Sequence, residues 1–486
     1  MLQSTLQYAS KKSPNTYQLI LAALIAGFAA SAFFLWRGDY EWHDHQRLAQ
    51  LLLLVAALTA IPYRKQLACP PLPLFGLCVI LLLGVASSLV SLFPGWALLE
   101  WSHWVGLLAL FLLVSSQVSN NLIRPLLLLL CGIAGLQAAD FVLMYAMAFV
   151  TGLREIDIQI LVSGFTNIRH YGQFQTLALP LLAAACLLSL QKKPWLAGLV
   201  LTVMSIQWCI ALALGGRGLY AAVLASHLLM LLFAPRHWRQ AAAQAIALLA
   251  GALLFLLLFR LIPDWLNLQS GSHALARSGL SSREDLWIKA IELTATNPWL
   301  GVGPMHYSAE AYSSSIFRIA SHAHQAVLQW TAEWGLPATL IACALVAWGL
   351  LAGLRRLRCD NNGGSGNPID PALWLSLCGA WVLAQVDGVM VMPYTQTWLA
   401  IIAGLAAARW CKSYSLPAKG RLVLGSFALS ALCVLLPVIL KEVPAFVDKS
   451  KAPEVHHFGL QQRFWANGPI REKHGDHQLW PFGSQP

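Results

Sequence analysis

The sequence contains few charged residues, and this scarcity decides its class. Only 11% of its 486 residues are Asp, Glu, Lys or Arg, whereas 58% are hydrophobic. A soluble globular domain has about a quarter of its residues charged, so this composition excludes one. Apolar runs of about 20 residues, the length that spans the hydrocarbon core of a bilayer, recur along the chain. The composition therefore predicts a polytopic membrane protein.

The sequence also lacks the apolar/polar alternation over about ten residues that is typical of membrane β-barrels. It predicts instead an all-α bundle of about 12–13 transmembrane helices. The thirteen apolar segments are 17–36, 48–62, 72–93, 98–118, 123–150, 172–190, 195–214, 219–234, 241–262, 325–354, 371–390, 395–409 and 422–440. No small-residue cleavage site follows the first segment, so a cleavable signal peptide is not expected.

Long polar stretches are rare, and one of them separates two groups of apolar segments. Residues 264–335 carry many charged, amide and imidazole side chains. We divide the chain accordingly into N-terminal transmembrane helices (1–263), a large periplasmic loop with short helices (264–324), C-terminal transmembrane helices (325–440) and a polar tail (441–486). A water-exposed insert between apolar helices is where we expect chemistry on a hydrophilic substrate.

The lysines and arginines of the short loops predict the orientation, because positively charged loops stay on the cytoplasmic side. Alternate loops hold most of them, at 11–12, 64–65, 124, 192–193, 236–239, 355–358 and 412–421. The opposite loops, the large loop and the tail then face outward, to the periplasm of a bacterial inner membrane. The formal net charge of +11 is thus a topology signal and requires no nucleic-acid partner.

Cysteine is absent from the outward loops. All ten cysteines lie in apolar segments or in or beside the inward loops, so a disulfide framework is not expected. The Cys/His spacing of a metal site is missing as well, and we expect neither a bound metal nor another cofactor.

Arginines are frequent in the outward loops, although the positive-inside rule disfavours them there. Convergent guanidinium groups bind phosphate through paired hydrogen bonds, so the set suggests a diphosphate ligand. For any single arginine, the alternative is contact with lipid headgroups or a nearby acid. The strongest candidate is Arg217, which lies in a Gly-Arg-Gly break between two apolar segments with no acid nearby. The full set is Arg37, Arg47, Arg154, Arg169, Arg217, Arg277, Arg283 and Arg318.

Arg283 opens a short amphipathic helix that ends at residues 297–298. The acidic Glu284 and Asp285 suit the positive N-terminal end of a helix. The apolar face that includes Trp287 predicts that this helix lies on the membrane surface. Arg283 projects from the same side and could bind a phosphate at headgroup depth, with pairing to a nearby acid as the alternative.

A second polar group lies at the outer end of the tenth apolar segment. Gln325, Gln329 and Glu333 recur every four residues and form a polar stripe on a helix. On a helix, His322 and His324 would point in nearly opposite directions, which disfavours a shared metal ion. One of these histidines could act as a base or hydrogen-bond partner for an acceptor hydroxyl. A structural interfacial histidine is the alternative.

The order of these features resembles the O-antigen ligase superfamily, which includes lipopolysaccharide O-antigen ligases, O-antigen polymerases and bacterial protein O-oligosaccharyltransferases. The resemblance covers roughly residues 160–400 and includes the loop 298–303. It implies an undecaprenyl-diphosphate-linked glycan donor, with Arg217 and Arg283 on the diphosphate and His324 as the catalytic histidine. The family usually has asparagine where this chain has Gln325, so His322 remains the second candidate.

Two further stretches resemble the pilin-glycosylating branch of the superfamily. One covers residues 164–175 and contains Arg169, Gln173 and Gln175. The other contains Asp387 and Tyr394. These side chains could bind sugar hydroxyls or phosphate. Asp387 is costly to bury within a span and is a functional candidate for that reason, with an ion pair to an arginine as the alternative. For Tyr394 the alternative is an interfacial aromatic residue.

Together these features predict a metal-independent, inverting glycosyltransferase. The arginines would neutralise the lipid diphosphate while His324 orients or deprotonates the acceptor hydroxyl. We expect the acceptor to be a Ser or Thr of a pilin-like protein. A lipid A core sugar or a second lipid-linked glycan is the alternative. A transporter of lipid-linked glycans is more remote, because no internal repeat or polar path through the spans is visible.

The tail, 441–486, contains four prolines and shows no helical period. We expect it to be loosely ordered, solvated and on the outer side of the membrane.

Overall fold

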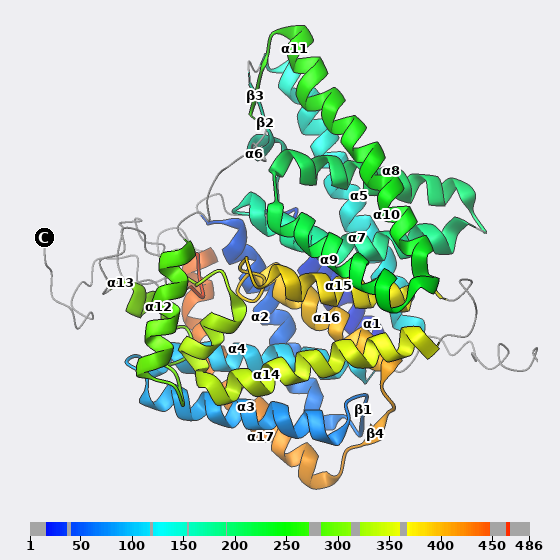
Figure 1. Ribbon diagram of the computed structural model, residues 1–486. Helices are drawn as coiled ribbons and strands as arrows, with labels where there is room; N and C mark the ends of the chain where they lie inside the picture. Colours follow the sequence, from blue (N-terminus) through cyan, green and yellow to red (C-terminus); the bar gives the residue numbers. More distant parts are fainter. Residues whose placement is uncertain are drawn as a thin grey trace, which may run out of the picture.

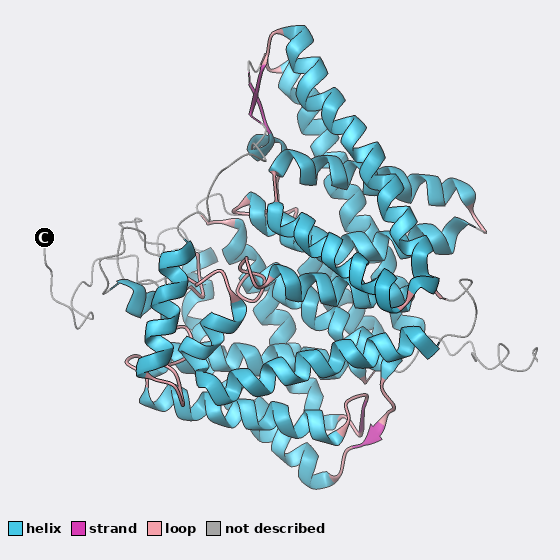
Figure 2. Ribbon diagram, viewed as in Figure 1, coloured by secondary structure: helices cyan, strands magenta, loops and turns pink. Residues whose placement is uncertain are grey.

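The computed structural model describes residues 16–35, 40–116, 120–152, 155–190, 192–271, 283–312, 321–359, 367–447 and 463–466. Nearly all of the regular structure in these ranges is helical, as Figure 2 shows. The helices before the large loop are α1 (Thr16–Ala30), α2 (Trp42–Ala60), α3 (Pro71–Val90), α4 (Pro94–Ser115), α5 (Asn120–Val150), α6 (Ile158–Leu161), α7 (Ile168–Leu190), α8 (Pro194–Leu214), α9 (Arg217–Phe233), α10 (Trp238–Leu256) and α11 (Ile262–Leu266). Those that follow are α12 (Arg283–Thr296), α13 (Tyr307–Tyr312), α14 (Ala326–Cys359), α15 (Ile369–Leu383), α16 (Pro393–Trp410) and α17 (Ala418–Val447).

The predicted fold class, an all-α polytopic membrane protein, is confirmed. Each of the thirteen predicted apolar segments overlaps a helix. Within the described ranges, nine helices are long and apolar enough to cross a membrane. The other four, α1, α9, α15 and α16, are shorter or less apolar.

Prolines and a glycine explain several helix ends. Pro71, Pro94, Pro194 and Pro393 are the first residues of α3, α4, α8 and α16. Proline suits this position because the first helical N–H has no intrahelical partner and the ring fixes a helical φ. Gly215 ends α8 with φ of 65°, a left-handed conformation that glycine adopts without steric cost.

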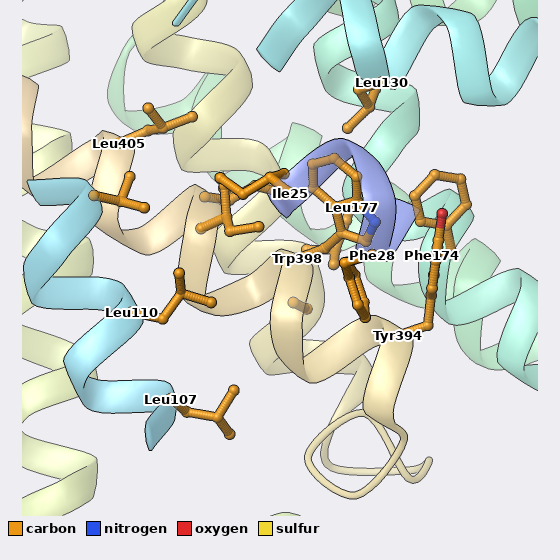
Figure 3. Close-up of a cluster of buried hydrophobic side chains, with 14 of the residues drawn as sticks. Ile25, Phe28, Leu107, Leu110, Leu130, Phe174, Leu177, Tyr394, Trp398 and Leu405 are labelled. Carbon is orange, nitrogen blue, oxygen red and sulfur yellow. The ribbon is translucent and has the colours of Figure 1, made fainter. Parts of the chain in front are cut away.

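The helices pack into one bundle, with α12 and α13 at one end of it (Figure 1). Helix α14 packs against α3, α15 packs between α7 and α9, and α4 contacts α2, α16 and α17. Figure 3 shows part of the core where α1, α4, α7 and α16 meet. Its labelled side chains include Ile25, Phe28, Leu110, Phe174, Leu177, Tyr394 and Trp398.

Two small sheets connect distant loops. β1 (Gln66–Leu67) pairs antiparallel with β4 (Tyr414–Ser415), in the register Gln66↔Ser415. β2 (Glu155–Asp157) pairs in parallel with β3 (Gln269–Gly271), in the register Glu155↔Gln269. The second sheet links the loop before α7 to the segment that follows α11 (Figure 1).

The loop 298–303 packs against a kink in α14. At Gly335, φ is 79° and the helical backbone is interrupted. The loop fills this interruption, because the Val302 N–H donates to the Ala332 carbonyl at 2.8 Å and the Leu336 N–H to the Pro298 carbonyl at 2.8 Å. A Cβ on Gly335 would lie 2.3 Å from the Trp299 oxygen. Only glycine allows this contact between two backbones.

Helix α12 ends at Thr296, next to the predicted stop, but its packing differs from the prediction. Leu286, Ala290 and Leu293 are buried, and Ala290 and Leu293 belong to a cluster that also contains Ala332 of α14. The helix therefore packs on α14 as well as presenting apolar side chains such as Ile288 and Ile291 on its outer face. A prediction based on one apolar face missed this second contact.

The expectation of a loosely ordered, solvated tail is wrong for the part of it that the structure describes. Helix α17 continues to Val447, and residues 463–466 lie inside the bundle. Arg463, Phe464 and Trp465 are 9%, 0% and 2% exposed. The physical reason is that buried carboxylates of α4 and α14 bind the Arg463 guanidinium. Residues 448–462 and 467–486 lie outside the described ranges.

Candidate active site

The two predicted histidines lie in a turn just before α14, at the end of the predicted loop 264–324. His324 has φ of 53°, the left-handed region that few non-glycine residues adopt. The start of α14 is tied to the end of α15, because the Ala326 N–H donates to the Ala384 carbonyl at 2.8 Å. Gln325 Nε2 also donates to Gln385 Oε1 at 3.0 Å. These bonds hold the histidine turn against residues 384–388.

His324 faces Asp387, which is the first contact within the site. His324 Nδ1 lies 3.7 Å from Asp387 Oδ1, with side-chain exposures of 23% and 14%. The same carboxylate accepts the Gly388 N–H at 2.7 Å and Gln173 Nε2 at 3.2 Å. Burial raises the pKa of Asp387, whereas the His324 ring and the Gly388 N–H lower it. The lowering effects together are larger, so the net shift of the pKa is downward. Asp387 is therefore a carboxylate at neutral pH.

His322 is more buried than His324 and packs against it. Its ring is 5% exposed, and its centroid is 4.0 Å from that of His324. His322 Nδ1 accepts the His324 N–H at 3.3 Å. Burial, followed by the charge of His324, holds the pKa of His322 well below its usual value, so the ring is neutral. The opposite orientation that a helical backbone would give does not occur, because the turn brings the two rings together.

Glycines explain how these elements approach one another. A Cβ on Gly388 would lie 2.7 Å from His322 Cε1, so a side chain there would displace the ring. A Cβ on Gly218 would lie 2.9 Å from Leu383 Cδ1, so this glycine lets the start of α9 pack tightly on the end of α15. Arg217 begins α9 and is thereby brought to the same end of the bundle as Asp387.

Three of the predicted arginines converge on this end of the bundle. Arg283 is half-buried at the first position of α12, while Arg169 and Arg217 are exposed in the first turns of α7 and α9. Burial lowers the pKa of Arg283, the Asp387 carboxylate opposes this shift, and the charges of Arg169 and Arg217 add to it. Arg283 thus lies within electrostatic range of two like charges and one unlike charge.

We call these six residues the arginine–histidine cluster: His322, His324, Asp387, Arg169, Arg217 and Arg283. Five separate elements contribute to it: α7, α9, α12, the turn before α14 and the segment after α15. Such a set of positive charges suits an anionic ligand with several oxygens. Of the remaining outward arginines, Arg47 does not join this cluster, because it is buried between α2, α4 and α16. The other four lie outside the described residues: Arg37, Arg154, Arg277 and Arg318.

Of the two predicted glutamines, the structure brings one to the cluster. Gln173 bonds to Asp387, and its Oε1 accepts the Thr395 hydroxyl at 3.2 Å. Gln175 is two residues further along α7, so it points away and donates to the Gln207 carbonyl of α8 at 2.7 Å. Gln175 therefore joins two helices and does not contact the cluster.

Tyr394 is also outside the cluster. Its hydroxyl donates to the Ala29 carbonyl at 3.0 Å, and its ring stacks on Phe28 at 5.2 Å (Figure 3). The ring is 1% exposed, so Tyr394 joins α16 to α1 in the core. The sequence alone does not distinguish a tyrosine that faces a site from a tyrosine that packs in the core.

One neighbour of the cluster was not among the predicted site residues. His170, in the first turn of α7, lies within electrostatic range of Asp387 and His324. Its position next to Arg169 at the start of an apolar segment was the available signal. Among the residues that the structure describes, no group of three His, Cys, Asp or Glu side chains is arranged to hold a metal ion.

An apolar cavity of about 410 Å³ begins beside the cluster. It lies between α3, α4, α14 and α16, and its lining is almost entirely apolar. Ala326 and Met390 line it, two residues after His324 and three residues after Asp387. Its other lining residues include Leu77, Leu107, Trp330 and Leu399. A cavity of this lining suits a hydrocarbon chain.

The fold and the cluster define a class: a multi-pass membrane protein that gathers arginines, histidines and one carboxylate at one end of a helical bundle, beside an apolar cavity. The family model described as O-antigen ligase matches residues 200–343 of this chain. The predicted resemblance to the O-antigen ligase superfamily is therefore confirmed, and it supports a transferase for lipid-linked glycans. The matched range contains four of the six cluster residues, all except Arg169 and Asp387. No match to this chain was found among curated proteins.

Proposed function

We propose that this protein transfers a glycan from undecaprenyl diphosphate to a hydroxyl group of an acceptor protein at the periplasmic face of a bacterial inner membrane. The observation that carries the proposal is the arginine–histidine cluster, in which a His324–Asp387 pair lies among three arginines. An acid–base pair for the acceptor and cations for an anionic leaving group are the two requirements of such a transfer.

The donor would bind across the cluster and the apolar cavity. Arg169, Arg217 and Arg283 come from the ends of three helices, so their guanidinium groups could surround a diphosphate from different sides. The cavity between α3, α4, α14 and α16 begins at Ala326 and would take the first part of the polyprenyl chain. A donor with a charged diphosphate and an apolar polyprenyl chain would account for the position of the three arginines next to the apolar cavity.

The chemical step would use His324 as the base. With Nδ1 directed at Asp387, Nε2 is the nitrogen left to accept the proton of the acceptor hydroxyl. The acceptor oxygen forms a bond to the anomeric carbon as the bond from that carbon to the diphosphate oxygen breaks. The electron pair goes to the diphosphate, which the arginines stabilise, and the imidazolium is stabilised by Asp387. Attack opposite the leaving group inverts the anomeric centre, and no step requires a metal ion.

The acceptor is proposed to be a Ser or Thr of a pilin-like protein. The support is the stretch 164–175, which resembles the pilin-glycosylating branch and which brings Arg169 and Gln173 to the cluster. A ligase that uses the lipid A core would share the donor site, so only the acceptor distinguishes the two activities.

Complementation in cells tests this proposal. The chain, its His324→Ala variant and a His237→Ala control are expressed in two hosts, one lacking an O-antigen ligase and one lacking a pilin glycosyltransferase. His237 lies beyond the other end of α9, about 25 Å from Arg217 at 1.5 Å per residue. Glycan is scored on pilin and on lipopolysaccharide by gel shift and mass.

We expect glycan on pilin with the wild-type chain and the control, and none with His324→Ala. Glycan on lipopolysaccharide alone would contradict the protein acceptor and favour a ligase. Undiminished transfer by His324→Ala would contradict the proposed base.

A further inference from the structure

The tail enters the bundle and supplies a cation to two buried carboxylates. Arg463 Nη2 donates to Glu333 Oε2 at 2.8 Å and to Glu100 Oε1 at 3.0 Å, and Arg463 Nη1 donates to Glu333 Oε1. Glu333 and Glu100 are 1% and 3% exposed. Two anions at this depth need a cation close by, because burying an unpaired charge is strongly unfavourable.

The residues after Arg463 are held by α2. The Phe464 carbonyl accepts Arg47 Nε at 3.0 Å, and the Phe464 ring lies 4.9 Å from the Arg47 guanidinium carbon. The Ala466 N–H donates to Asp44 Oδ1 at 2.7 Å. We call Arg463, Phe464, Glu100, Glu333, Arg47 and Asp44 the tail cluster. Through these contacts, Arg463, Phe464 and Ala466 join the tail to α2, α4 and α14.

Glu333 also connects the tail cluster to the loop that carries the candidate site. Its Oε1 accepts the Tyr307 N–H at 3.0 Å, while its carbonyl accepts the Gly303 N–H at 3.1 Å and the Ser87 hydroxyl at 3.2 Å. The Tyr307 hydroxyl in turn donates to the Leu286 carbonyl at 2.8 Å. Leu286 is three residues from Arg283, on the first turn of α12. A chain of contacts thus runs from Arg463 to the helix that presents Arg283.

The turn that contains His322 and His324 packs against the same residues around Glu333. Ala323, between His322 and His324, is fully buried in a cluster with Tyr307 and Ala332. Ala332 directly precedes Glu333. The charge of Arg463 also reaches His322, where it adds to the effects of burial and of His324 in lowering the pKa of that ring. Both parts of the candidate site therefore depend on the residues that Arg463 binds.

We propose that Arg463 is a positioning residue, and that the tail of this chain completes the active site by fixing Glu333 and, through it, the histidine turn and α12. Arg463 does not touch the reacting groups. Its planar fork binds both oxygens of Glu333 while Nη2 also reaches Glu100, an arrangement that a lysine ammonium does not reproduce. The predicted effect of Arg463 on turnover rests on the proposed function. The predicted effect on the histidine turn and α12 does not.

The test compares Arg463→Gln, Arg463→Lys and a control, Arg236→Gln, in the purified full-length chain. Arg236 is exposed in the turn after α9, away from the cluster. Amide hydrogen exchange is measured without substrate in residues 299–307 and 321–325 and, for comparison, in α7 and α8. Transfer from an undecaprenyl-diphosphate-linked glycan is measured per folded molecule.

For Arg463→Gln we expect exchange to accelerate more in 299–307 and 321–325 than in α7 and α8, and kcat to be lower by about 10- to 100-fold, since small displacements of catalytic groups have effects of this size. Arg463→Lys should be intermediate on both readouts, and Arg236→Gln should match the wild type. If wild type transfers no glycan, the proposed function fails, while the exchange data still test the positioning role.

Wild-type kcat together with wild-type exchange at 321–325 in Arg463→Gln would overturn the proposal. A uniform acceleration that includes α7 and α8 would also overturn it, because it would show a general loss of stability. If Arg463→Gln yields no folded protein, Arg463→Lys decides: wild-type values on both readouts would overturn the proposal, and a local loss would support it.

Discussion

The molecule contains two groups of charged residues that are close in the fold and opposite in character. In the tail cluster, the Arg463 cation lies directly between the carboxylates of Glu333 and Glu100, and all three side chains are buried. In the arginine–histidine cluster, Arg283 lies near two like charges and one carboxylate, and Arg169 and Arg217 are exposed.

The two clusters differ in whether the charges are already paired within the protein. Paired charges have a structural role, whereas like charges that lie together suit the binding of an ion of opposite charge. A buried pair with matched partners holds elements together and leaves no capacity for another ion. Like charges gathered at a half-exposed site raise the free energy of the empty protein, and an anionic ligand relieves this repulsion. The comparison predicts that substitutions in the first group lower stability, and change activity only by displacing the site, whereas those in the second change activity with little change in stability.

The largest effect is expected from Asp387→Asn in the arginine–histidine cluster. The substitution keeps the size of the side chain but removes the carboxylate that orients His324 and stabilises its protonated form. We expect kcat to fall by about 10²- to 10⁴-fold, the usual contribution of positioned acid–base groups. The unfolding temperature should change little. A steady-state transfer assay, with thermal unfolding of the same samples, checks both; a stability loss without a loss of kcat would break the comparison.

In the tail cluster, Glu333→Gln should lower stability, with any loss of kcat following from the displaced histidine turn and α12. The substitution breaks the fork between Arg463 and Glu333, and removing one partner of a buried ion pair costs about 3–5 kcal/mol. We expect a clearly lower unfolding temperature in detergent. The matched control is Glu292→Gln, which removes an exposed carboxylate on α12. Equal unfolding temperatures for the two variants would contradict the structural role of the tail cluster.

Arg283→Gln should raise the donor KM by about 10- to 100-fold, because a hydrogen bond to a charged group contributes about 1.5–3 kcal/mol. Stability should be unchanged or slightly higher, since the repulsion with Arg169 and Arg217 is reduced. Donor titrations of wild type and variant test this expectation. The same titration with Arg358→Gln, an exposed arginine near the end of α14, supplies the control. An unchanged donor KM in Arg283→Gln would remove this residue from the site.

The smallest effect concerns pH and His322. The pKa of the buried ring lies well below 6.5, so it stays neutral in the folded state, whereas the unfolded chain takes up a proton below about pH 6.5. Its contribution to stability is therefore full above pH 6.5 and falls by about 1.4 kcal/mol per pH unit below it. His322→Gln should weaken the pH dependence of the unfolding temperature between pH 7.5 and 5.5. An identical pH dependence in both proteins would mean that His322 is not held neutral.

The sequence was sufficient for the helices and for much of the arginine–histidine cluster. Long apolar runs specify spans because the bilayer allows few alternatives, and alternating topology then brings the outward ends of these spans to one side. This topology places Arg217 and Arg283 on the outward side, whereas the resemblance to the O-antigen ligase superfamily grouped these two arginines with His324 and drew attention to Asp387. Gln175 and Tyr394 were included because polarity alone does not show which side of a helix faces the site.

The tail cluster could not be predicted in the same way. Arg463 is 130 residues from Glu333 and 363 residues from Glu100, and the tail has the composition of a solvated segment. One signal was present: Glu100 lies inside an apolar segment, where a carboxylate is costly and requires a partner. The sequence could indicate that a cation was needed, but not which of the many arginines supplied it.

The central claim is that one cluster both binds the diphosphate and moves the proton. The most direct measurement places the purified chain in lipid vesicles with an undecaprenyl-diphosphate-linked glycan and a pilin acceptor, and records donor binding and glycan transfer for wild type and His324→Ala. We predict that the variant binds the donor with wild-type affinity but transfers no glycan above background. Transfer at the wild-type rate by His324→Ala would contradict the claim.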